Sequence, residues 1–84
     1  MPEQQEQAAT ISTPFIELDK LLKREALTAS GGEARYLISQ GMVQVNGEVE
    51  SRKRRKLYAG DVVEFNGVRL CIEERPSPAR PEAV

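Results

Sequence analysis

The chain has 84 residues, with 12 basic and 13 acidic side chains and a formal net charge of -1, a length that allows one small domain. It has no histidine and a single cysteine, Cys71, which excludes disulfide frameworks, Cys/His zinc sites and imidazole acid-base catalysis. We therefore expect a protein that is not an enzyme, with no catalytic residue, metal ion, cofactor or small-molecule substrate. The lack of a long apolar run and of a signal-peptide pattern predicts no membrane contact and a cytoplasmic location.

The two ends of the chain are expected to be disordered. Residues 1–13 begin with a Glu- and Gln-rich stretch that shows no apolar periodicity. Residues 75–84 form a polar tail with Pro76, Pro78 and Pro81, which cannot pair in a sheet. The ordered domain is thus expected to span residues 14–74.

A first helix is expected from about Glu17 to Arg24. Leucines at i, i+3 and i+4 from Leu18 form one apolar face, which should lie in the core. Two interpretations of its start are open. Thr13-Pro14 fits a cap with proline in the first turn, whereas Phe15-Ile16 fits a short strand that enters the helix near Glu17.

A second helix is expected after Ser30. Ser30 and Glu33 fit a capping box, in which the serine oxygen accepts from the backbone three residues on and the glutamate reaches back. Ala34, with Leu37 and Ile38, keeps the helical spacing of a buried face. Gly41 is the kind of residue that ends a helix in the left-handed conformation.

The remainder predicts two hairpins. Asn46-Gly47 and Asn66-Gly67 are the residues that type I′ turns require, and apolar residues alternate on either side of both turns. The fold class is therefore α+β, with two short helices packed on a small, bent antiparallel sheet that has two Asn-Gly hairpins.

A strongly basic segment connects the two hairpins. Its five consecutive cations are Arg52, Lys53, Arg54, Arg55 and Lys56, and without them the rest of the chain carries a net charge of -6. Polyanions respond to the local field, so this segment predicts a polyanion-binding surface on an acidic molecule. Glu48, Glu50 and Asp61 are expected to balance only part of its charge.

The order of these features resembles the S4-type RNA-binding domain, or alpha-L motif. The similarity is in Leu18-Asp19, Ser30 through Ile38, Gly41, Val45-Asn46-Gly47 and Gly60-Asp61. Within that superfamily, the segments 30–34 and 50–57 are most similar to the YbcJ-like group of small stand-alone bacterial proteins. The resemblance implies the alpha-L fold and binding of RNA, with ribosomal RNA or a ribosome-assembly intermediate as the target.

Two positions depart from the superfamily pattern. Glu17 and Gly31 stand where arginines are usual before the first helix and at the start of the second. Gly31 and Gly32 would let a phosphate approach the backbone N–H groups at a helix N-terminus, or they merely allow a tight turn between the helices. Both interpretations are open at this stage.

Further cations are expected to extend the basic surface. These are Lys20, Lys23 and Arg24 on the first helix and Arg35 on the second, with Glu17 or Asp19 able to neutralise part of the charge. The four aromatic residues offer few stacking platforms, which favours structured RNA, recognised by shape and phosphate, over single strands. The competing hypothesis is a protein-interaction module that docks on an acidic partner, such as a ribosomal protein or an RNA-modifying enzyme.

Overall fold

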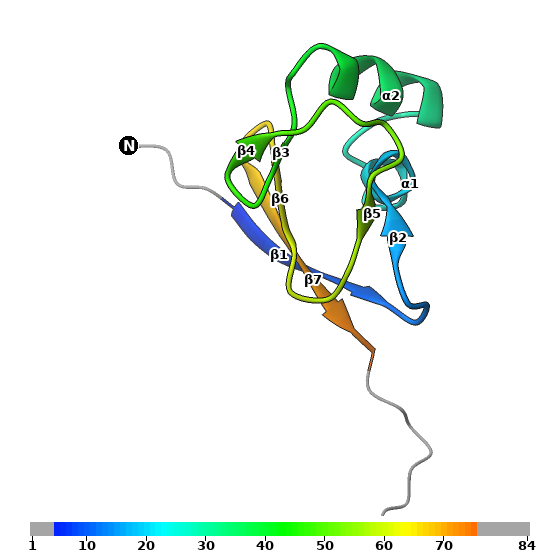
Figure 1. The fold of residues 1–84 in the computed structure, drawn as a ribbon, viewed down its shortest axis with the longest axis vertical. Coiled ribbons are helices and arrows are strands. Elements are labelled where there is room, and N and C mark those ends of the chain that lie inside the picture. Colours follow the sequence, from blue (N-terminus) through cyan, green and yellow to red (C-terminus); the bar gives the residue numbers. More distant parts are fainter. Residues whose placement is uncertain (1–4, 76–84) are drawn as a thin grey trace, which may run out of the picture.

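The computed structural model describes residues 5–75 (Figure 1). The helices are α1 (Leu18–Arg24) and α2 (Gly31–Ser39). The strands are β1 (Gln5–Ile11), β2 (Ile16–Glu17), β3 (Gln44–Val45), β4 (Glu48–Val49), β5 (Lys56–Leu57), β6 (Val62–Phe65) and β7 (Val68–Glu74). Neither helix has the length or the apolar character needed to span a membrane.

The main sheet has five strands in the order β1-β7-β6-β3-β4. All neighbours pair antiparallel except β1 and β7, which are parallel and lie side by side in Figure 1. The predicted α+β fold with two helices on a small sheet is thus confirmed, but the sheet is mixed and not antiparallel throughout, because β1 adds a parallel strand. A separate antiparallel pair, β2 with β5, joins the entry of α1 to the end of the basic segment.

The N-terminal segment corrects a second expectation. Residues 5–11 were expected to be disordered but form β1, so the ordered domain begins well before residue 14. Ala9 and Ile11 on this strand are 1% and 3% exposed, and both lie in the core. A strand whose buried positions are an alanine and one isoleucine among polar residues shows little periodicity in the sequence. Residues 1–4 and the proline-rich segment 76–84 lie outside the described residues.

The two helices follow the sequence closely. A short strand enters α1, which is the second of the two interpretations of its start, and all three leucines of α1 are fully buried. The hydroxyl of Ser30 accepts from the N–H of Glu33 at 3.1 Å, and Glu33 accepts from the N–H of Ala29 at 2.6 Å. The glutamate therefore reaches one residue further back than a capping box requires.

Two-residue turns join β3 to β4 and β6 to β7. Asn46 and Gly47 have φ of 53° and 86°, and Asn66 and Gly67 have 52° and 82°, which is the left-handed conformation that these residue types tolerate. The Asn46 side chain also contacts β6, because its Oδ1 accepts from the N–H of Val62 at 2.9 Å.

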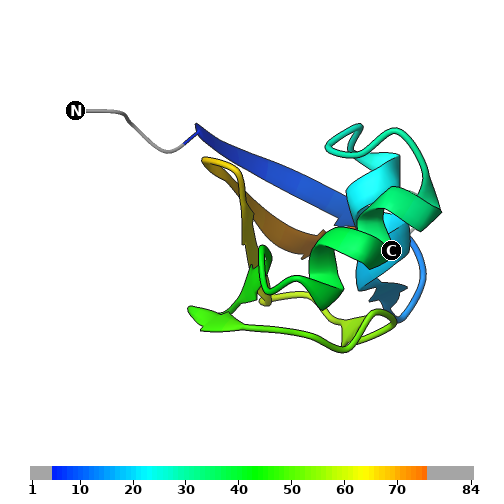
Figure 2. The same cartoon turned by 90° about the horizontal axis from the view of Figure 1, so that it is seen from above.

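The core lies between the helix pair and the sheets. Its largest fully buried side chains come from both helices and from β3, β5, β6 and β7. Figures 1 and 2 show α1 and α2 against each other, with α1 next to the β2–β5 pair. The basic segment runs from β4 to β5 and so passes beside the helices.

Candidate nucleic-acid interface

The backbone of the basic segment is attached to the N-terminus of α1. The N–H of Leu18 donates to the carbonyl of Arg55 at 2.9 Å, and the N–H of Asp19 donates to the carbonyl of Lys53 at 3.1 Å. The first N–H groups of a helix have no partner within the helix, so these carbonyls satisfy two of them. The five cations are thereby held beside the two helices.

The buried carboxylate of Glu50 binds two arginines of the same segment. Only 7% of this residue is exposed, and its carboxylate accepts from the N–H and Nε of Arg52 at 2.8 and 2.9 Å. It also accepts from Nη2 of Arg52 and from Nη1 of Arg55, each at 2.9 Å. The Arg52 side chain nevertheless remains 72% exposed, so its charge is paired but still faces solvent.

Of the three acidic residues expected to balance the basic segment, Glu50 is the one that forms ion pairs with it. Glu50 pairs with two of the five cations, whereas Asp61 accepts from the Asn46 side chain and from the N–H of Tyr58. The ammonium of Lys56 lies 4.9 Å from the centre of the Phe15 ring, a cation–π contact. Within residues 5–75, Lys53 and Arg54 make no ion pair.

The lowered pKa of Glu50 predicts how the stability of the fold depends on pH. The Arg52 guanidinium, by its hydrogen bonds to the carboxylate, lowers the pKa of Glu50 from 4.5 to about 2. Because the pKa is lower in the folded state, this group stabilises the fold above pH 4.5, and that contribution is lost as the pH falls toward about 2.

We expect Glu50→Gln to remove this component of acid sensitivity. Urea unfolding between pH 2 and pH 7 should show a smaller loss of stability toward low pH in the variant than in the parent protein. Glu48→Gln is the matched control, since Glu48 is an exposed carboxylate in β4. If Glu50→Gln and the parent lose stability in parallel, the assigned role of Glu50 is wrong.

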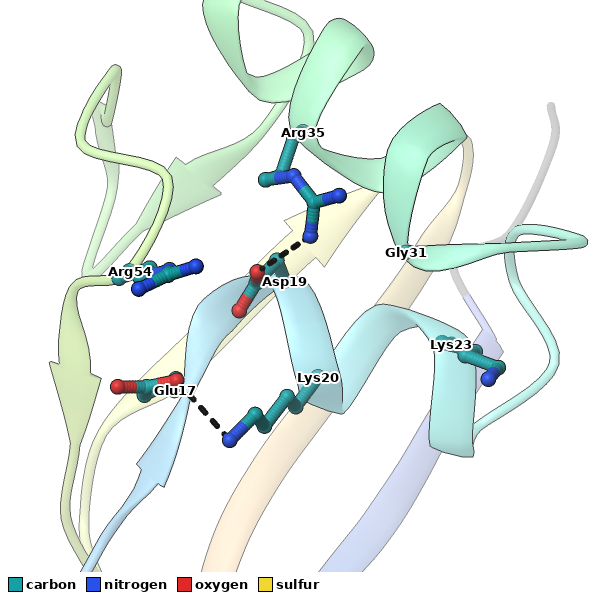
Figure 3. Close-up of a pocket in the computed structure, with 7 residues that line it drawn as sticks. All are labelled: Glu17, Asp19, Lys20, Lys23, Gly31, Arg35 and Arg54. Carbon is teal, nitrogen blue, oxygen red and sulfur yellow. Dashed lines mark hydrogen bonds and ion pairs between the residues drawn. The ribbon is translucent and has the colours of Figure 1, made fainter.

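A hollow of about 340 Å³ lies between the helices and the basic segment, and we call it the inter-helix hollow (Figure 3). Its lining residues are Glu17, Asp19, Lys20, Lys23, Gly31, Arg35 and Arg54. Nη1 of Arg35 donates to Oδ2 of Asp19 at 3.2 Å, and Lys20 pairs with Glu17 at 3.3 Å. Four cations against two carboxylates leave the hollow positive.

A second hollow, of about 480 Å³, lies on the basic segment itself, and we call it the loop hollow. Its lining residues are all cationic: Arg52, Arg54, Arg55 and Lys56. Arg54 lines both hollows, so the two positive regions adjoin each other. A surface with this arrangement attracts closely spaced negative charges, such as successive phosphates.

The structure separates the residues that the sequence grouped on the helices. The inter-helix hollow brings together four of them: Lys20, Lys23, Gly31 and Arg35. Arg24 lines neither hollow and instead pairs with Glu25 at 2.9 Å. Gly32 is also outside the lining, in the first turn of α2.

Neither Gly31 nor Gly32 has a positive φ, so the backbone conformation does not require glycine at these two positions. A Cβ on Gly31 would lie 3.3 Å from Nη1 of Arg35, closer than ordinary van der Waals contact. The missing side chain at Gly31 thus leaves room for the Arg35 guanidinium at the hollow. A contact of either glycine with phosphate remains a prediction.

Aromatic rings lie beside this surface as well. Tyr58 is 50% exposed and packs 5.9 Å from Phe15, centre to centre, and Tyr36 on α2 is 61% exposed. Phe65 is in the core, as expected from its alternation with Val63. Among residues 5–75, no group of three or more His, Cys, Asp or Glu side chains could hold a metal ion.

Comparisons with known proteins agree with this architecture. The model of the S4 domain family matches residues 9–73. YbcJ of Escherichia coli (strain K12) is 48% identical over 54 residues, which cover 64% of this chain and 77% of YbcJ. RlbA of Bacillus subtilis (strain 168), described as a probable ribosome maturation protein, is 45% identical over 58 residues, or 69% of this chain and 82% of RlbA.

A solved structure is similar over nearly the whole chain. The solution structure of E. coli YbcJ, reported to contain an alpha-L motif involved in RNA binding, superimposes with a TM-score of 0.59 and 37% identity. The match covers 87% of this chain and 91% of YbcJ. Family model, relatives and solved structure thus agree, and the chain belongs to the S4 domain family.

Proposed function

We propose that this chain is a non-enzymatic RNA-binding protein that recognises structured RNA mainly through phosphate contacts. The observation that carries the proposal is the position of Arg54, which joins the inter-helix hollow to the all-cationic loop hollow. Arginine contributes a planar fork that can hold a phosphate through two parallel hydrogen bonds. The membership of the S4 domain family and the RNA-binding motif reported for YbcJ support the same function.

Structured RNA suits this surface better than a single strand. Glu50 holds the side chains of Arg52 and Arg55, and the N-terminus of α1 holds the backbone of the segment at Lys53 and Arg55, so the path of the basic segment is set before binding. Such a surface complements phosphates whose spacing is also fixed, as in a folded RNA. Single-strand binding relies on several exposed rings in a row, and here Tyr36 and Tyr58 lie on different elements.

We infer that the target is ribosomal RNA or a ribosome-assembly intermediate. The name of RlbA, as a ribosome maturation protein, supports this target, and the chain covers 82% of that relative. Ribosomal subunit proteins would then be neighbours of the bound protein. In this proposal the protein binds the RNA directly, and any contact with ribosomal proteins is secondary.

Crosslinking in living bacteria, followed by sequencing of the attached RNA, tests this function. We expect ribosomal RNA fragments, clustered at a few positions and lost when the sample is treated with ribonuclease before purification. A complex that survives ribonuclease and contains an acidic protein would contradict the proposal. It would instead favour the docking module that charge alone also allows.

A further inference from the structure

Asp19 has one carboxylate oxygen that accepts no hydrogen bond from residues 5–75. The residue is 2% exposed and lines the inter-helix hollow, where its Oδ2 accepts from Arg35 at 3.2 Å. Its Oδ1 is buried and has no hydrogen-bond partner among the described residues. Buried polar atoms are paired in the large majority of cases, so an unpaired carboxylate oxygen beside a positive hollow is an acceptor that still lacks a donor.

We propose that Oδ1 of Asp19 accepts a hydrogen bond from a ribose 2′-hydroxyl, so that this residue selects RNA over DNA. The inference rests on the proposed RNA-binding function and deepens it. The 2′-hydroxyl is the group that distinguishes the two polymers at a single site, and an ionised acceptor makes the stronger kind of hydrogen bond with it.

The surroundings of Asp19 fit one nucleotide with its flanking phosphates. The hollow of about 340 Å³ is within the range of small-ligand pockets. Lys20, Lys23 and Arg54 on its rim are exposed and supply positive charge for the phosphates on either side of the ribose. Figure 3 shows the Asp19 carboxylate between Arg35 and the side chains of Glu17 and Lys20.

A hydroxyl matches the available acceptor better than a base or a cation. A guanine edge presents two donors that pair best with a carboxylate whose two oxygens are both without a partner, whereas Oδ2 of Asp19 already accepts from Arg35. A metal ion would face four cationic side chains with only two carboxylates in the lining. A ribose hydroxyl needs one oxygen, which is what Asp19 offers.

Access to Oδ1 depends on side chains that can move. The oxygen is covered in this structure. The Lys20 side chain is 72% exposed and Arg54 is also exposed, so both can turn toward phosphates without disturbing the core. Both line the same hollow as Asp19, so the proposal requires that their rotation on binding exposes Oδ1.

The test uses a ribosomal RNA hairpin that binds the full-length protein, synthesised with 2′-fluoro in place of 2′-hydroxyl at one nucleotide at a time. Fluorine keeps the sugar pucker of an RNA helix but cannot donate. We expect one position at which binding weakens about tenfold, the size of one hydrogen bond to a charged acceptor. The absence of any such position would overturn the inference.

Variants of the protein then assign that position. In Asp19→Ala the effect of 2′-fluoro there should fall below about twofold, while Glu17→Ala, the other carboxylate of the hollow, should keep it near tenfold. Equal sensitivity in Asp19→Ala and the parent would refute the role of Asp19. If no ribosomal RNA hairpin binds at low salt, it is the proposed function that fails.

A measurement on the parent protein guards against misfolding of Asp19→Ala. The carboxyl carbon of Asp19, observed by carbon-13 NMR, should shift on addition of the unmodified hairpin. It should shift much less with the hairpin that carries 2′-fluoro at the sensitive position. The same shift with both hairpins would contradict the proposed hydrogen bond.

Discussion

Simultaneous replacement of Lys23, Lys53 and Arg54 by alanine should weaken binding to a ribosomal RNA hairpin about a hundredfold at about 0.1 M monovalent salt. These three side chains are exposed and make no ion pair within the part of the chain that the structure describes. Their charges are therefore the ones most available to phosphates. Each phosphate contact contributes about -0.7 to -0.9 to the slope of log affinity against log salt, so the loss of three contacts should make the slope shallower by about 2 to 3.

The control removes the same charge from other surfaces. Arg24, Arg69 and Arg75 line neither hollow, and their joint replacement by alanine changes the net charge equally. We expect less than about a fivefold loss of affinity, because phosphates at the interface respond to the local field. If both triple variants bind equally well at every salt concentration, net charge alone determines binding and the assigned surface is wrong.

Ile11→Ala should destabilise the fold by about 3 kcal/mol, the second large effect that we expect. Ile11 is 3% exposed and lies in the core on β1, where its carbonyl also accepts from the N–H of Arg75 at 2.7 Å. Truncation would leave a cavity beside β7. In a domain this small, such a loss is a large fraction of the total stability.

Thr10→Ala is the matched control for this prediction. Thr10 is the neighbouring residue on the same strand and is exposed, so its replacement should change stability by less than about 0.5 kcal/mol. Urea unfolding followed by circular dichroism measures both variants. Similar stability of Ile11→Ala and the parent would show that β1 contributes little to the fold.

Local sequence signals were enough to predict the helices. The leucine spacing from Leu18 and the Ser30–Glu33 pair each determine a structure within a few residues, so they can be identified without knowledge of the rest of the fold. The resemblance to the S4 domain was confirmed by the family match. It rested on the order of several such local features.

The parallel strand β1 could not be predicted in the same way. Its stability comes from pairing with β7, more than fifty residues away, with Ala9 opposite Ile72 and Ile11 opposite Glu74. The strand itself carries two Gln, one Glu and one Thr among its seven residues, a composition that is also typical of disorder. Only the non-local contact distinguishes the two cases.

The candidate site was predicted in composition but not in arrangement. The basic segment is evident in the sequence, whereas the hydrogen bonds from Leu18 and Asp19 to its carbonyls depend on the tertiary fold. The sequence predicts that nearby acidic residues balance part of this charge, but it does not predict that Glu50 pairs with both Arg52 and Arg55. The unpaired oxygen of Asp19 has no sequence signal at all, because it follows from burial and geometry.

Titration of nitrogen-15-labelled protein with ribosomal RNA hairpins at low ionic strength tests the central claim most directly. We predict that the largest backbone shifts occur in residues 52–56, at the N-terminal ends of α1 and α2 and at Arg35, all around the two hollows. Shifts should be small on the hairpin turn at Asn66-Gly67. No shift in residues 52–56, or shifts confined to that turn, would contradict the claim that these cations present an RNA-binding surface.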